Sequence, residues 1–387
     1  MFGMNPSEAA PDGRIIKVGI IGCGMVTQVI HVPSLSALSH LFQVTYLCDV
    51  SEEAMKHSQT KVAGNSRPQT TRSVEELCNA PEVELVLIAS NHAFHASDAV
   101  LALQANKCVF IEKPIALTLQ DTDRIIAADK AAGGGRVFIG YMRRYAAAFV
   151  DAVKEVGSIG QIRYARVRDI IGPNSVFVSQ SGTYPRTFND YREADSEALR
   201  AKTRDDMEQA LQAELGVTVT RETVMMWEML SILGSHDLSA MREILGMPKG
   251  VVGFSPCATV GSPFWSAIFQ YPNFAVAYES GVDQVARFDA SIEIFGDTKT
   301  VKVCIESPFI RGLPTTMVVK ESLSDGSYRE STTRRTYEDP FMLELKEVYQ
   351  WVAEGNIPKT TPSDARQDLE ILGMLMKARA ASKQLAL

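Results

Sequence analysis

The sequence places a lysine where proton-transfer chemistry can occur. Glu112-Lys113-Pro114 directly follows an apolar, strand-like run at residues 108–112. A lysine held at a strand end and partly removed from water has a lowered pKa, so it can exchange a proton with a substrate hydroxyl. From its spacing alone, an exposed structural lysine is the better interpretation of Lys113.

A glycine-rich loop precedes this lysine in the chain. The run GIIGCG at residues 19–24 lies between the first expected strand and the first expected helix. Glycines at such a turn let the backbone approach a pyrophosphate at the helix N-terminus. The third glycine of the usual fingerprint is replaced by Thr27. The cofactor-binding residues predicted here are Gly22, Gly24, Met25 and Val26.

An acidic residue, Asp49, ends the second expected strand. Its carboxylate would accept hydrogen bonds from an adenosine ribose and repel a 2′-phosphate, which favours NAD over NADP. The structural alternative is an aspartate that starts a turn before Ser51.

A third polar cluster, SNHAFH at residues 90–95, follows the strand-like run 84–89. Open α/β sheets bind ligands at the carboxyl ends of their strands. We therefore predict cofactor contacts from Ser90, Asn91 and His95. The intervening His92 is better explained as a helix-capping or surface residue.

The elements that position these residues alternate between short β-branched runs and amphipathic stretches, which predicts an α/β fold with a doubly wound parallel sheet. The expected strands are residues 16–21, 44–48, 84–89, 108–112 and 137–140. After residue 146 extended runs dominate, and helices are expected at 341–354 and 365–383. We predict a dinucleotide-binding domain at 14–146 and an α+β domain with an open, mostly antiparallel sheet at 147–387.

A polar insertion at about residues 172–221 interrupts the second domain, and its centre, 196–215, has a helical composition. It is interpreted equally well as a lid over a site or as a solvated surface insertion. Tyr184, Arg186 and Tyr191 would accordingly reach a substrate or coat the surface.

Composition limits the classes of function. The chain has 387 residues, a net charge of −7, 45% hydrophobic residues and 22% charged residues, which excludes disordered and collagen-like structure. No apolar stretch approaches the roughly 20 residues of a membrane span, and residues 1–12 carry no signal-peptide pattern. Mild acidity argues against a nucleic-acid partner. The sequence therefore predicts a cytoplasmic protein with a small-molecule partner.

Cysteine and histidine spacing adds two further expectations. The six cysteines show no CxxC pair and are predicted to be reduced packing residues. The histidines and acidic residues show no compact ligand spacing, so no metal site is expected.

The order of these motifs resembles the Gfo/Idh/MocA oxidoreductase family. The glycine loop, the 91–95 cluster and Glu112-Lys113-Pro114 carry the resemblance, and GYMRRY at 140–145 is similar to a motif of the inositol dehydrogenase branch. GSHDL at 234–238 falls where the family carries its substrate-side histidine. The resemblance spans about residues 15–385 and implies an NAD(P)-binding Rossmann domain joined to an α+β domain that often mediates oligomerisation, so a homo-oligomer is expected.

The resemblance also implies roles for individual residues. Lys113 would touch both nicotinamide ribose and substrate, Glu112 would lie on the cofactor side, and His236 would hydrogen-bond or deprotonate the hydroxyl being oxidised. A capping or core histidine is the structural alternative for His236. Predicted substrate contacts are Tyr141, Arg143, Asp237 and Tyr184.

Two departures from the family pattern leave the reaction open. The dehydrogenase branch often has a carboxylate four residues before the histidine, where this chain has Ile232, and Ala146 stands where the inositol branch tends to have aspartate. The leading hypothesis is an NAD-dependent oxidoreductase acting on a hydroxyl or carbonyl of a sugar, cyclitol or related metabolite. The alternatives are an NAD-retaining lyase, epimerase or glycosidase that uses transient oxidation, and a non-catalytic NAD-binding regulatory protein.

Overall fold

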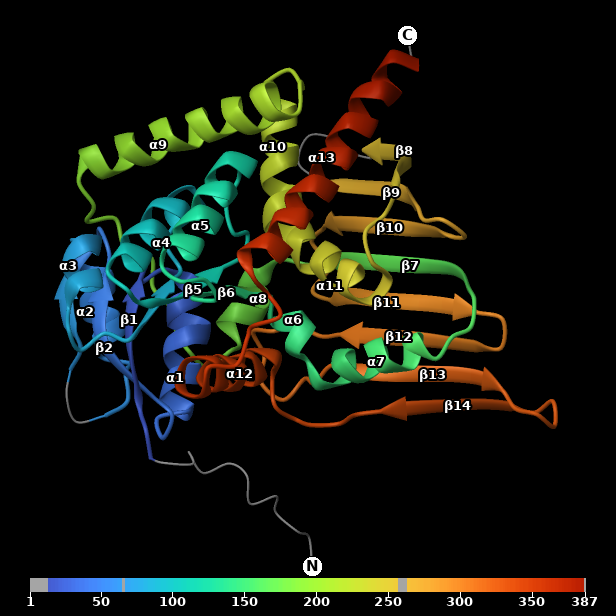
Figure 1. The fold of residues 1–387 in the computed structure, drawn as a ribbon, viewed down its shortest axis with the longest axis horizontal. Coiled ribbons are helices and arrows are strands. Elements are labelled where there is room, and N and C mark those ends of the chain that lie inside the picture. The colour runs from blue at the N-terminus through green and yellow to red at the C-terminus, as the bar shows by residue number, and fades with distance from the viewer. Residues whose placement is uncertain (1–12, 65–66, 257–262, 386–387) are drawn as a thin grey trace, which may run out of the picture.

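Two β-sheets organise the chain, with helices packed around both (Figure 1). The computed structural model describes residues 13–64, 67–256 and 263–385. The first sheet contains strands from the N-terminal third of the chain, and the second contains strands from residue 162 onward. We keep 14–146 and 147–387 as the proposed domain bounds.

The first sheet is parallel throughout, as the alternating pattern predicts. Its strands, in spatial order, are β3 (Gln69–Thr71), β2 (Phe42–Cys48), β1 (Ile16–Ile21), β4 (Leu85–Ile88), β5 (Cys108–Glu112) and β6 (Val137–Gly140). The central strands are buried and continuously apolar because helices cover both faces of the sheet. Strand order reverses between β1 and β4, and a doubly wound sheet binds its ligand at that point.

Three of the helices around this sheet begin at side chains that cap them. Ser51, Ser73 and Thr118 each accept a hydrogen bond from the backbone N–H three residues later, which fixes where α2, α3 and α5 start. The helices between β1 and β7 in the chain are α1 (Val32–Ala37), α2 (Glu52–Gln59), α3 (Val74–Asn79), α4 (His95–Gln104), α5 (Leu119–Ala131), α6 (Met142–Tyr145) and α7 (Ala147–Gly157), of which α7 packs against the second sheet. The α1 helix is preceded by a π-helical turn, η2 (Thr27–His31), and α4 by a 3-10 turn, η3 (His92–Phe94).

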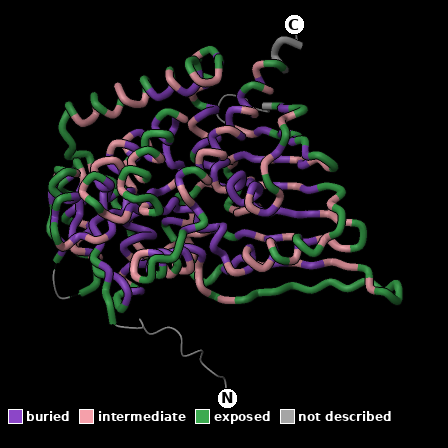
Figure 2. The backbone as a smooth tube through the Cα atoms, viewed as in Figure 1, coloured by how far each residue is buried: buried purple, intermediate pink, exposed green. Residues whose placement is uncertain are grey.

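The second sheet is antiparallel except for the β7–β10 pair, which is parallel. Its strands, in spatial order, are β14 (Tyr328–Thr333), β13 (Thr316–Ser322), β12 (Lys299–Ile305), β11 (Phe288–Gly296), β7 (Ile162–Ile171), β10 (Ala275–Val282), β9 (Phe264–Gln270) and β8 (Gly250–Pro256). Alternate residues are buried along the central strands, while β14 at the edge is exposed (Figure 2). The predicted open, mostly antiparallel sheet is confirmed.

Helices from the second half of the chain complete both layers. They are α8 (Asn174–Ser179), α9 (Glu193–Met207), η4 (Glu208–Glu214), α10 (Arg221–Met229), η5 (Leu230–Gly234), α11 (Ser235–Leu245), α12 (Pro340–Glu354) and α13 (Pro362–Leu385). Figure 1 shows α9 running across the helices that cover the first sheet. Lys202 of α9 lies 2.7 Å from Asp121, and Met207 at its end is buried in the core. Glu214, in η4, accepts hydrogen bonds from the backbone N–H groups of Leu119 and Gln120.

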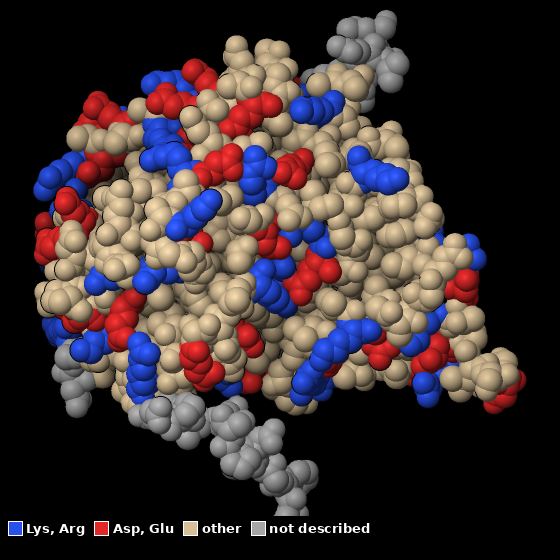
Figure 3. All heavy atoms as spheres, in the orientation of Figure 1, with Lys and Arg blue, Asp and Glu red and all other residues tan. Residues whose placement is uncertain are grey.

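Acidic and basic side chains are mixed over the visible surface (Figure 3). Within the described ranges, no helix is long and apolar enough to cross a bilayer, and no cluster of three potential metal ligands occurs. The five described cysteines are free, and Cys257 lies outside the described residues.

Candidate active site

Two cavities meet at the carboxyl edge of the first sheet. The adenosine-side cavity, about 830 Å³, lies over the glycine loop and Asp49. The substrate-side cavity, about 370 Å³, is lined by Lys113, His236 and Arg143. Met25 lines both. One continuous stretch of surface therefore connects the predicted cofactor loop to the predicted proton-transfer residues.

The glycine loop has the backbone shape that its sequence predicts. Gly22 adopts φ of 95°, and a Cβ there would lie 2.4 Å from the carbonyl oxygen of Ala89. A Cβ on Gly24 would meet nothing within 4 Å, and Gly24 lines the adenosine-side cavity. The first glycine is thus required by the fold, while the second leaves open space for a ligand to approach the backbone.

Thr27 replaces the third glycine without leaving a polar atom unpaired. Its side chain is fully buried, and its hydroxyl donates a hydrogen bond to the carbonyl of Gly22 over 2.6 Å. The π-helical turn η2 begins at this residue. A wider helical turn combined with a satisfied hydroxyl explains how a β-branched residue fits where the fingerprint usually has glycine.

Asp49 lies directly beside the glycine loop. One carboxylate oxygen accepts a 2.6 Å hydrogen bond from the N–H of Cys23, and the other accepts a 2.8 Å bond from the N–H of Ser51. Burial raises the pKa of Asp49, against the effect of these two hydrogen bonds. Each oxygen keeps lone-pair capacity for a ribose hydroxyl, so Asp49 both braces the loop and faces the cavity.

The loop after β4 packs behind Gly22 and does not line either cavity. Ser90 donates to Asp98 over 2.8 Å, and Asn91 caps η3 by accepting from the N–H of Ala93. The ring nitrogens of His95 lie 2.9 Å from the Pro114 carbonyl and 3.1 Å from the Ser90 carbonyl. These residues hold the β4 and β5 loops together, and their direct contact with a cofactor stays a prediction.

Lys113, just after β5, contacts η5 at the substrate-side cavity. Its Nζ donates a 2.8 Å hydrogen bond to the backbone carbonyl of Ile232, in η5. Burial lowers the pKa of Lys113 to about 8, with Glu112 opposing that shift and Arg143 adding to it. A lysine with this pKa exists in both protonation states near neutral pH, as proton exchange requires.

Glu112 lines the same cavity, and its carboxylate is held in a buried pair. Its Oε1 lies 2.8 Å from His31 Nε2, and its Oε2 accepts the N–H of Lys113 over 3.1 Å. Burial raises the pKa of Glu112, but the interactions with His31 and Lys113 outweigh it and the net pKa is lowered. Glu112 is therefore a carboxylate, and in that form it fixes the backbone at Lys113.

His236 lies in the first turn of α11, with its side chain half-buried in the cavity wall. Burial lowers its pKa well below the usual value, and Lys113 and Arg143 lower it further. Its Nδ1 is buried with no hydrogen-bond partner among the described residues. The ring is thus a neutral imidazole at physiological pH.

A buried charge network supports this wall from behind. The Arg143 guanidinium pairs with Asp237 and lies 3.1 Å from Asp169 on β7, and it stacks over the Phe288 ring. Burial raises the pKa of Asp237, and the neighbouring Asp169 raises it further. Arg143 lines the cavity, whereas the two carboxylates lie behind it.

The remaining predicted substrate residues lie elsewhere. Tyr141 is buried outside both cavity linings, and Tyr184 is exposed on the adenosine side. Sequence reasoning missed His31 and Asp169, which act through Glu112 and Arg143. Asp169 follows three arginines along β7, so residue types alone did not mark it as buried.

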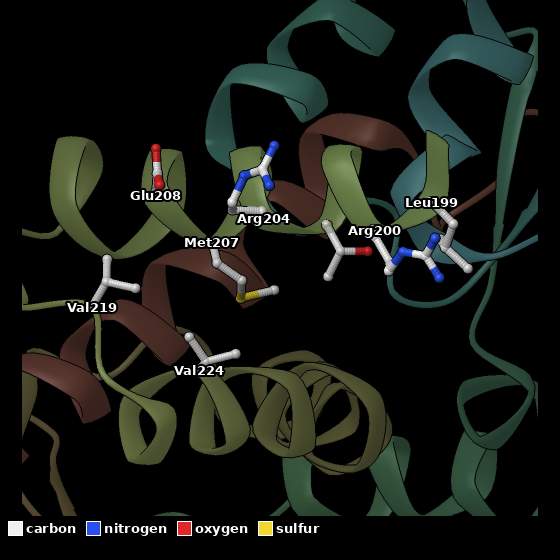
Figure 4. A pocket seen from close by; sticks show the side chains of 8 residues that line it. Leu199, Arg200, Arg204, Met207, Glu208, Val219 and Val224 are labelled. Carbon is white, nitrogen blue, oxygen red and sulfur yellow. The ribbon is translucent and has the colours of Figure 1, made fainter. Parts of the chain in front are cut away.

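A third cavity, about 420 Å³, lies between α9 and α10 and shares no lining residue with the other two (Figure 4). Met207, Val219 and Val224 form its apolar wall, and Arg200 and Arg204 line it from α9. It contains none of the predicted chemical groups.

Comparisons with known proteins bear directly on the first sheet. Residues 16–141 match the family model described as "Oxidoreductase family, NAD-binding Rossmann fold". Over 148 residues the chain is 35% identical to inositol 2-dehydrogenase of Salmonella typhimurium, an alignment that covers 38% of this chain and 43% of that enzyme. The chain thus spans less than half of the length of such relatives.

A longer alignment and two solved structures extend the comparison. Myo-inositol 2-dehydrogenase of Thermotoga maritima is 25% identical over 374 residues, covering 95% of this chain and 97% of that one. Aldose-aldose oxidoreductase from Caulobacter crescentus has a TM-score of 0.67 at 18% identity, covering 95% and 98%. Biliverdin reductase from Synechocystis has a TM-score of 0.63 at 17% identity, covering 94% and 98%.

These structures share the fold of this chain across both sheets, and the family match falls on the sheet that carries the glycine loop and Lys113. Residues 16–141 therefore match the Gfo/Idh/MocA oxidoreductase family with an NAD-binding Rossmann fold, and the likeness to a myo-inositol 2-dehydrogenase extends over most of the chain.

Proposed function

We propose that the protein is an NAD-dependent dehydrogenase that interconverts a hydroxyl and a carbonyl on a sugar, cyclitol or related polar metabolite. The observation that carries the proposal is the substrate-side cavity, where Lys113 and His236 line one wall beside the glycine loop. The inositol dehydrogenases among the relatives support a polyhydroxylated substrate.

The residues present fit a dinucleotide. The space above Gly24 leaves room for a pyrophosphate at the start of the following helix, and Asp49 lies where an adenosine ribose would be bound. Met25 and Val26 line the substrate-side cavity, where the nicotinamide half would lie. When bound, NAD supplies the hydride acceptor.

His236 and Lys113 have different roles in the proposed proton transfer. A neutral His236 donates its ring N–H to the oxygen of the substrate hydroxyl and orients it. Lys113 in its neutral form takes the hydroxyl proton, and in its protonated form returns a proton in the reverse reaction. The half-buried apolar surroundings exclude water from this exchange, because Ile171, Leu233 and Phe288 line the same cavity.

Turnover with a substrate panel tests the proposal. Purified full-length protein is mixed with NAD and sugars or cyclitols, and nicotinamide absorbance at the reduced-cofactor band is followed. Substrate-dependent reduction of NAD is the expected result. A folded protein that binds no nicotinamide cofactor would contradict it.

Cofactor-retaining chemistry is the second candidate, and the 172–221 segment favours it. Residues 184–188 and Tyr191 of that segment line the adenosine-side cavity and would lie against a bound cofactor. Ile232 also stands where the dehydrogenase branch often has a carboxylate. Product formed without added cofactor, by protein that co-purifies with NAD, would favour an epimerase, lyase or glycosidase.

One variant distinguishes a regulatory protein from an enzyme. If Lys113→Met keeps cofactor binding and leaves the biological activity unchanged, the protein is a sensor and not an enzyme. The homo-oligomer, the cytoplasmic location and the small-molecule partner stay predictions.

A further inference from the structure

We propose that Asp190, just before α9, and Asp195, in the first turn of α9, make the adenosine-side cavity select NAD(H) over NADP(H). The proposal rests on the cofactor binding proposed above. It assigns cofactor selection to an inserted segment of the second half of the chain, in addition to Asp49.

Contacts at two places fix the inserted segment to the rest of the fold. At its start, Gly172 donates a 2.8 Å hydrogen bond to the Arg287 carbonyl, and a Cβ there would lie only 1.9 Å from the carbonyl oxygen of Val285. Further along, Arg186 exchanges two hydrogen bonds with the side chain of Gln28, over 2.9 and 3.1 Å. The segment is therefore part of the cavity wall and its geometry is defined.

Asp190 accepts hydrogen bonds from donor groups in the residues that follow Asp49 in the chain. Its carboxylate accepts from the Ser51 hydroxyl and, over 3.0 Å, from the N–H of Glu53 in the first turn of α2. These bonds lower the pKa of Asp190, so the group carries a full negative charge at neutral pH. A hydroxyl and a helix N-terminus are donors that a ribose 2′-phosphate would use.

Asp195 pairs with the neighbouring cation, Arg72. The Arg72 guanidinium donates to the carbonyl of Val50 and lies 2.6 Å from the Asp195 carboxylate. An arginine beside the acidic ribose position is the group that accommodates a 2′-phosphate in NADP-binding relatives of this fold. Here that arginine is already paired, so its charge is compensated before any cofactor binds.

The local charge balance then disfavours a phosphate. Asp49 and Asp190 both accept hydrogen bonds from Ser51, at its N–H and its hydroxyl, so the two carboxylates are close. Burial is the main cause of the raised pKa of Asp49, and the Asp190 charge raises it further. Arg186 is the one cation among the described residues that line the cavity. It provides the opposing hypothesis, because its exposed guanidinium could bind a 2′-phosphate.

Equilibrium binding tests the proposal without any substrate. Full-length protein freed of cofactor is titrated with NADH and with NADPH, and nicotinamide fluorescence gives the two Kd values. We expect Asp190→Asn and Asp195→Asn each to reduce the NADH preference by about tenfold, since charged hydrogen bonds of this kind are worth about that factor. Glu193→Gln is the control, because Glu193 pairs with exposed Arg200 away from the cavity.

The outcomes distinguish a failure of the proposed cofactor selection from a failure of the proposed function. A ratio of Kd values unchanged in both aspartate variants overturns the inference, as does a wild-type preference for NADPH that disappears in Arg186→Gln. If the folded wild-type protein binds neither cofactor, the proposed function fails, and this inference with it.

Discussion

The two cavities contrast in how they are built. The substrate-side cavity is walled by groups whose charges are buried and paired, with Glu112 on His31 and Arg143 on two aspartates. The adenosine-side cavity is walled by backbone, a glycine loop and the largely exposed residues of an inserted segment. Burial shifts the pKa values of the groups in the substrate-side cavity. The residues that the inserted segment contributes to the adenosine-side cavity are largely exposed, so they can be substituted without altering the chemistry at Lys113.

Removing the amine at the substrate side should have the largest effect. Lys113→Met is expected to lower kcat/KM by roughly 10²- to 10⁴-fold, the usual contribution of a positioned proton-transfer group. NADH affinity measured by fluorescence should change far less. Lys130→Met, at an exposed lysine in the last turn of α5, is the matched control and should retain full activity. Equal loss in both variants would contradict the assigned role.

Breaking the buried charge network should affect stability next most strongly. Arg143→Met leaves Asp169 and Asp237 uncompensated, and we expect the free energy of unfolding to fall by about 3–5 kcal/mol at pH 7. The deficit should shrink as pH falls, because the raised folded-state pKa of a buried carboxyl makes its protonated form easier to bury.

Chemical denaturation at pH 5 and pH 8 measures this. The control is Arg163→Met, whose pair with Asp297 is about half exposed on both sides and should contribute less than about 1 kcal/mol. A similar small loss of unfolding free energy in both variants would show that the buried network is not required for stability.

The pH dependence of catalysis should follow Lys113. Its pKa of about 8 lies below the ordinary lysine value, so the neutral amine is lost as pH falls through 8. Oxidation should therefore slow by about tenfold per pH unit below that point. His236 remains neutral throughout this range and adds no inflection. A flat kcat/KM profile from pH 6 to 9 would contradict the assignment.

A smaller effect should come from the cap of α2 at the adenosine side. Ser51→Ala removes the helix cap and the bond to Asp190, with a cost of about 1 kcal/mol to stability and a few-fold loss of NADH affinity. Ser73→Ala removes the equivalent cap of α3, outside either cavity lining, and should cost stability alone. Equal NADH affinity in the two variants would show that the inserted segment contributes nothing to binding.

The sequence predicted most of the sheet architecture because both sheets have clear hydrophobic patterns. The β3 strand was missed, since its three residues, Gln69–Thr71, are too few to show a period. The helical part of the insertion at 196–215 was expected and is confirmed by α9 and η4. The π-helical geometry of η2 and η5 has no simple signature in residue types.

Several residues that motifs singled out lie together, and their roles stay predictions. Lys113, His236, Arg143, Met25 and Val26 all line the substrate-side cavity. Contacts such as Asp169 with Arg143 and Asp190 with Ser51 join residues that are distant in the chain. Only the folded topology brings such pairs together, so spacing in the sequence could not reveal them.

The acceptor for Lys113 has a practical consequence for protein engineering. Because Nζ bonds to the main-chain oxygen of Ile232, any residue at position 232 except one that distorts η5 preserves that contact. The Ile232 side chain is itself 41% exposed and lines the substrate-side cavity. Position 232 is therefore a site where saturation mutagenesis can alter substrate range while leaving the anchor of the lysine intact.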